Sequence, residues 1–150
     1  MNNEIRIELI ERWLGVVYPS YLRYLSRLDP HRIWDERFPQ AARATLRRVH
    51  TEQDVFCDNL AKILDSLGEE PDAPQFPENA SRLNYLELSV AINFTLKRFA
   101  TNIAVLQADR PAVADDTQMA ELLEKGIDML QRHSVVLKPL AAESTKTGPG

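Results

Sequence analysis

The sequence predicts an all-α fold, specifically one four-helix bundle. The chain has 150 residues, a size at which a single domain can bury most of its apolar surface in one core. It contains only 5 glycines, which argues against a turn-rich β architecture. Apolar side chains recur in steps of three and four over four long stretches, the spacing of one face of a helix. The predicted helices cover about residues 4–28, 39–67, 80–109 and 116–138.

The first predicted helix, residues 4–28, carries an apolar stripe along its whole length and ends at Asp29-Pro30. Pro19 lies inside this stretch, where it removes a backbone hydrogen bond and its ring crowds the preceding turn. We therefore expect a kink near Val16.

The second predicted helix, residues 39–67, has the most regular stripe. Pro39 suits a first turn, and Gly68 suits the left-handed residue just past a helix end. The stripe has one polar member, Gln53, and consists of Leu46, Val49, Gln53, Phe56, Leu60, Ile63 and Leu67. The proline-rich run EEPDAPQFPENA that follows cannot continue a helix and is predicted to cross between helices within the same domain.

The third predicted helix, residues 80–109, is the most apolar and ends before Pro111. Opposite its core stripe, its first half carries a second apolar face, which is unusual for a surface helix. This face consists of Leu83, Leu86, Val90 and Phe94. It is covered either by another part of the chain or by another subunit, and in the second case these residues form the interface of a homodimer.

The fourth predicted helix, residues 116–138, opens at the Asp-Asp-Thr run that starts at Asp115, where short polar side chains can accept free backbone N–H groups. Pro139 is expected to end it. We therefore expect residues 1–140 to form one domain and residues 141–150 to be a disordered tail.

Two histidines are the candidates for chemistry. His50 lies on the flank of the second stripe and His133 lies in the fourth stripe, and imidazole is a common metal ligand. With Glu11 and Glu87 they would supply one ligand from each helix, as in metal sites in bundle cores. The alternative is that both rings bond neighbouring polar groups in or beside the core, with Gln53 a natural partner, and that Glu11 lies on a solvated helix edge.

The run HTEQDVFCDNLAKILDSLGEEP, which begins at His50, resembles the second helix of ferritin-like and rubrerythrin-like bundles, in which a histidine-bearing helix ends in a Leu-Gly turn followed by a proline. That resemblance implies Glu-x-x-His pairs as metal ligands on the second and fourth helices. Here Arg47 and Leu130 stand three positions before His50 and His133. Both carboxylate positions depart from the pattern, so the resemblance supports a fold more than an activity.

Composition bears on partners and location. The formal net charge is −4, which gives no electrostatic reason to expect binding to nucleic acid or to an anionic membrane. Cys57 is the single cysteine and cannot form an intramolecular disulfide, and the first residues lack the pattern of a secretory signal, so a cytoplasmic protein is expected. A basic cluster at Arg43, Arg47 and Arg48 is either a solvated helix face or a site for an anion or an acidic partner.

From these patterns we expect a non-enzymatic helical bundle that acts through protein–protein contacts, with itself or with another protein, and without a cofactor. The doubly apolar third helix supplies the surface. The alternative is a divergent ferritin-like metal-binding protein or oxidoreductase that holds iron, manganese or zinc through His50, His133 and Glu11.

Overall fold

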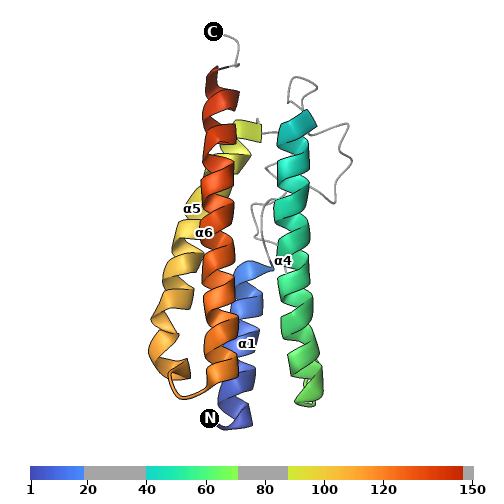
Figure 1. Cartoon of the computed structure of the whole chain (residues 1–150), viewed down its shortest axis with the longest axis vertical. Helices are drawn as coiled ribbons and strands as arrows, with labels where there is room; N and C mark the ends of the chain where they lie inside the picture. The colour runs from blue at the N-terminus through green and yellow to red at the C-terminus, as the bar shows by residue number, and fades with distance from the viewer. Residues whose placement is uncertain (19–39, 71–87, 147–150) are drawn as a thin grey trace.

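The computed structural model describes residues 1–18, 40–70 and 88–146 of the chain. Within these residues it contains no β-strand, and its four α-helices confirm the all-α four-helix bundle (Figure 1). A short 3-10 helix links the last two. The elements are α1 (Asn3–Val17), α4 (Gln40–Ser66), α5 (Leu88–Ala108), η2 (Arg110–Val113) and α6 (Thr117–Lys146).

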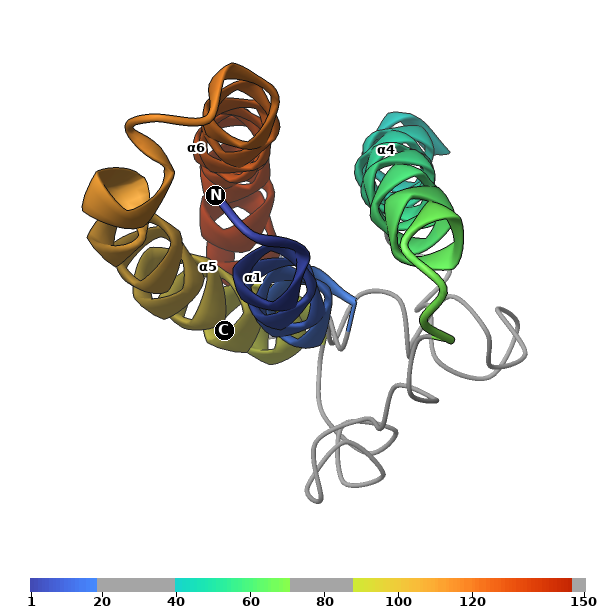
Figure 2. The same cartoon turned by 90° about the horizontal axis from the view of Figure 1, so that it is seen from below.

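Neighbouring helices run mostly in opposite directions. α5 and α6 are antiparallel, as expected from their short connection, and α4 is antiparallel to α6 (Figure 1). Seen from the end, α1, α5 and α6 form one group and α4 stands across from them (Figure 2). α4 contacts both α1 and α6, so a single apolar core lies between the four helices.

The core contains side chains from every helix, and those of the predicted stripes dominate it. On α4 the stripe is buried from Leu46 to Leu60, and near the C-terminal end Leu64 replaces the half-buried Ile63. The largest fully buried side chains are Trp13, Phe99, Ile10, Leu60, Leu64, Ile92, Leu106, Met119, Leu123 and Ile127. Burial of such side chains contributes about 1.5–3 kcal/mol each, which makes this core the main source of stability.

Two buried carboxylates join α1 to the turn between α5 and α6. Asp109 accepts hydrogen bonds from the indole of Trp13, at 2.9 Å, and from the guanidinium of Arg12. Asp116 accepts one from Arg6 at 2.8 Å. The Trp13 side chain can therefore be fully buried, because its N–H group has an acceptor.

Two predicted helix ends are confirmed. Gly68 has φ 84°, and the N–H groups of Gly68 and Glu69 donate to carbonyls of the last turn of α4, including Leu64, in the Schellman arrangement. At the start of α6, Asp116 accepts a hydrogen bond from the N–H of Met119 at 3.1 Å and thereby caps the helix.

The C-terminal end of α6 differs from the prediction. The helix continues through Pro139 to Lys146, so the expectation of a helix that ends near residue 138 and of a disordered tail is wrong for residues 141–146. The reason is burial: Leu140 and Ala141 are only 9% and 6% exposed, and continued helix places both in the core. Pro139 itself is exposed, so its ring faces solvent while the helix passes it.

Other predictions lie partly outside the described residues. α1 is described to its end at Val17, so the predicted continuation to Leu28 lies beyond it. The kink predicted near Val16 falls in the last turn of the described helix and stays a prediction. The predicted first turns of the third helix, residues 80–87, also lie outside. In the part of the chain that the structure describes, no helix is both long and apolar enough to cross a membrane.

Candidate functional site at the seam between α4 and α6

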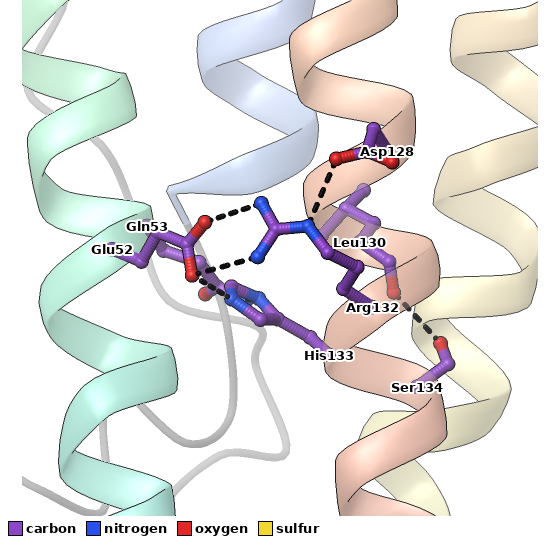
Figure 3. A network of polar contacts seen from close by, with 7 residues as sticks. All are labelled: Glu52, Gln53, Asp128, Leu130, Arg132, His133 and Ser134. Atoms are coloured by element: carbon purple, nitrogen blue, oxygen red, sulfur yellow. Dashed lines mark hydrogen bonds and ion pairs between the residues drawn. The ribbon is translucent and has the colours of Figure 1, made fainter.

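A network of polar side chains joins α4 to α6 halfway along the bundle (Figure 3). Glu52 and Gln53 project from α4, and Arg132 and His133 project from the facing side of α6. The antiparallel helices bring two adjacent residues of one helix opposite two adjacent residues of the other. One residue of each pair, Gln53 and His133, belongs to a predicted core stripe and is buried.

Both ring nitrogens of His133 are engaged. Nε2 lies 2.9 Å from Oε2 of Glu52, and Nδ1 lies 3.2 Å from Nε2 of Gln53. A carboxylate only accepts, and an amide nitrogen only donates. The ring is therefore neutral in this arrangement, with its hydrogen on Nε2 directed at Glu52 and its Nδ1 lone pair directed at Gln53. This confirms the interpretation of His133 as a core histidine with Gln53 as a partner.

Burial controls the protonation of His133. Loss of solvent lowers the pKa of the imidazole below its ordinary value of 6.5, the nearby Glu52 carboxylate opposes this by favouring the charged form, and Arg132 adds to the lowering. The hydrogen bond from Arg132, followed by the effect of His133, holds the pKa of Glu52 below 4.5 in spite of partial desolvation. The pair thus combines an ionised carboxylate with a neutral imidazole.

Arg132 completes the network on the solvent side. Its guanidinium donates to Oε1 of Glu52 at 2.5 Å and to Oε2 at 3.4 Å, and its Nε donates to Asp128 at 2.8 Å. Arg132 is about half exposed and Glu52 somewhat less, whereas His133 is almost fully buried. The seam is therefore graded from a solvated ion pair outside to an uncharged hydrogen bond inside.

Gln53 has an unused acceptor. Its Oε1 is buried and has no hydrogen-bond partner among the described residues. A half-turn of the amide would exchange the amide nitrogen for this oxygen beside Nδ1 of His133, and that oxygen can accept a hydrogen bond from a protonated ring. If the amide turns, His133 can therefore take up one proton and donate to Gln53, and the buried position without a partner is then occupied by the amide N–H group instead of the oxygen.

The three predicted metal ligands are not brought together. His133 faces Glu52, whereas His50 lies beside Asp54 of its own helix, with Nδ1 to Oδ2 at 3.4 Å. Glu11 lies on the exposed side of α1. Among the residues that the structure describes, no three His, Cys, Asp or Glu side chains are grouped so that they could hold a metal ion. Glu87 lies outside the described residues.

Sequence reasoning missed Glu52 and Arg132. Each stands directly before a buried polar member of a stripe, Gln53 or His133, and therefore at the edge of the same helix face. A buried glutamine and a buried histidine on two packed helices are a signal that these edge positions carry partners of complementary charge.

The predicted interface residues are described only in part. Leu83 and Leu86 lie outside the described residues, and Val90 lies in α5 but its side chain is outside them. Phe94 is described and is 42% exposed. That Phe94 belongs to a larger apolar face with the other three residues stays a prediction.

No protein-family model, curated protein or solved structure matches this chain. The resemblance of the run beginning at His50 to ferritin-like bundles stays a prediction. The function therefore has to be inferred from the chain's own residues.

Proposed function

We propose that this protein is a non-enzymatic, cytoplasmic helical bundle that acts by binding protein, either another copy of itself or a different chain. The observation that carries the proposal is Phe94, which leaves 42% of its surface exposed on a helix whose opposite side packs into the core. Phenylalanine side chains are enriched in the centres of protein interfaces, where burial of the ring is favourable.

The surroundings of Phe94 fit a contact surface. On the same side of α5, Lys97 and Arg98 follow after one helical turn and are exposed, whereas Ile92 and Phe99 on the other side are buried. An apolar side chain next to two cations is the arrangement of an interface with an apolar centre and a charged rim. A partner that buries Phe94 would present an apolar side chain with carboxylates beside it.

Photocrosslinking in the producing cell tests this proposal. A benzophenone amino acid at position 94 should give one discrete crosslinked product, whose mass distinguishes a homodimer from a complex with a different protein. The matched control carries the same group at Val135, which is 66% exposed on α6. Discrete products at position 94 and none at position 135 would support the proposal. If position 94 gave no product, or the same products as position 135, the proposal would be wrong.

A further inference from the structure

The outward side of α4 is a continuous exposed face whose charges are separated along the helix. Its exposed positions recur in steps of four and three and are Ala44, Arg48, Thr51, Val55, Asp58 and Lys62, with Arg47 and Asp65 beside them. The arginines lie in the first half, and the second half carries both aspartates together with Lys62. Between them, Val55 is a large apolar side chain with 55% of its surface exposed.

The first half of this face is hollowed. The described residues that line it are Ala44, Arg47, Arg48, Thr51 and Glu52. The first four of these positions follow the i, i+3, i+4, i+7 pattern, which is the shape of the hole that receives one side chain of a partner helix in knobs-into-holes packing. Two of the lining residues are arginines, and the one carboxylate among them, Glu52, is already paired with Arg132. A small acidic side chain therefore complements the charge of the hollow.

We propose that α4 pairs with α4 of a second copy of this chain, antiparallel and about a two-fold axis near position 53, so that Asp58 of each copy enters the hollow between Arg47 and Arg48 of the other. This inference rests on the proposed function, binding to protein, and it names a second copy as the partner and α4, rather than the Phe94 side of α5, as the surface. Because a two-fold interface is self-complementary, every contact occurs twice.

One antiparallel register pairs the apolar centre and the Arg48–Asp58 positions of the two faces. With the axis near position 53, Thr51 lies opposite Val55 of the second copy, Arg48 lies opposite Asp58, and Ala44 lies opposite Lys62. The two Thr51–Val55 layers bury the exposed valines at the centre. The two Arg48–Asp58 layers flank them with opposite charges, which favours the antiparallel over the parallel orientation because a parallel pair would place arginine near arginine.

The Glu52 carboxylate, which lies near the axis, does not oppose this pairing. It is bonded within the chain to Arg132 and His133. Because the Arg132 guanidinium offsets its charge, two copies can approach without bringing two uncompensated Glu52 carboxylates together.

Charge reversal across the proposed contact provides the test. Arg48→Asp places a carboxylate opposite Asp58 in both layers, and Asp58→Arg places arginine opposite arginine, so each variant alone should associate about 100-fold more weakly than the parent. In an equimolar mixture of the two variants, both layers again pair opposite charges. The mixture should therefore form a dimer with one chain of each kind, measured by sedimentation velocity and native mass spectrometry, with circular dichroism to verify folding.

The controls separate this inference from the proposed function. Lys125→Asp reverses an exposed charge on α6 and should leave the dimer unchanged. A monomeric parent, a dimer that survives Arg48→Asp, or a mixture that fails to associate would each refute pairing through α4. Two outcomes would refute pairing through α4 and leave the proposed function standing. The first is a dimer that survives Arg48→Asp but dissociates with Phe94→Glu, and the second is a monomeric parent that still crosslinks through position 94.

Discussion

Gly126 on α6 packs closely against the ring of Phe56 on α4, and this contact determines the energetic effect of a larger side chain at position 126. A Cβ atom at this position would lie 2.8 Å from Cζ of Phe56 and within 3.5 Å of both neighbouring ring carbons, so the ring tip of Phe56 points directly at the glycine. Alanine in a helix is favoured over glycine by about 1 kcal/mol. Overpacking a buried seam costs about 1–3 kcal/mol, because the 9% exposed ring can move only if its neighbours move. We therefore expect Gly126→Ala to lower the free energy of unfolding by about 1 kcal/mol.

A double-mutant cycle checks this reasoning by urea denaturation followed by circular dichroism. In a Phe56→Leu background the ring tip is absent, so Gly126→Ala should then stabilise the protein by up to about 1 kcal/mol, a coupling of about 2 kcal/mol. Gly15→Ala in α1 is the matched control, because nothing lies within 4 Å of a Cβ atom there, and it should stabilise by about 0.5–1 kcal/mol. If Gly126→Ala stabilised the parent as much as Gly15→Ala does, the account of the seam would be refuted.

Three further predictions concern the core, the polar network and the ties to α1. Leu60→Ala should lower the free energy of unfolding by about 2–5 kcal/mol, because Leu60 is fully buried, and Lys62→Ala by less than about 0.5 kcal/mol; equal urea midpoints would show that the assigned face of α4 is wrong. Because the pKa of His133 is lowered on folding, the unfolded chain binds the proton more readily, so stability should be full above pH 6.5 and decrease as the pH falls below it. His133→Gln should abolish this decrease in stability between neutral pH and the pH at which carboxylates begin to titrate. The measurement is the urea midpoint as a function of pH, and a decrease that persisted in the variant would show that His133 is not its cause. Asp109→Ala should cost about 2–4 kcal/mol, since it leaves the buried indole N–H of Trp13 without its acceptor, and the blue-shifted fluorescence of a buried tryptophan should move to longer wavelength; an unchanged midpoint and spectrum would argue against this tie.

Local patterns predicted the helices well where burial and local chemistry agree. The stripe of α4 is buried at the expected positions, and Gly68 has the positive φ that its place after the helix requires. The predicted helix end at Pro139 was wrong. The missing backbone hydrogen bond at a proline can be read from the local sequence, whereas the free energy gained by burying Leu140 depends on packing against other helices, which the local sequence does not show.

The candidate site was only partly predictable for a related reason. Periodicity gives the direction of a side chain around its own helix, so Gln53 and His133 could be assigned to the core. It does not give the axial register of two helices, so it could not show that Glu52 meets His133 while His50 lies beside Asp54. The burial of Trp13 depends in the same way on an acceptor that lies far away in the sequence.

The seam also determines which face α4 turns outward. Only one axial register places Gln53 beside His133 and Glu52 beside Arg132, and a slide of one turn would leave the buried ring nitrogen of His133 without its partner, at a cost of about 1–3 kcal/mol. Apolar contacts alone define the axial register of two helices weakly, because after a slide of one turn another leucine can occupy the same hole. A hydrogen bond depends on direction and distance and is lost when one helix slides past the other. The network fixes the rotation of α4 about its own axis, because Gln53 has to face the core. The same rotation places Val55 on the solvent side of the helix. Rearrangement of the seam would therefore alter the exposed face of α4 even though no residue of that face had changed.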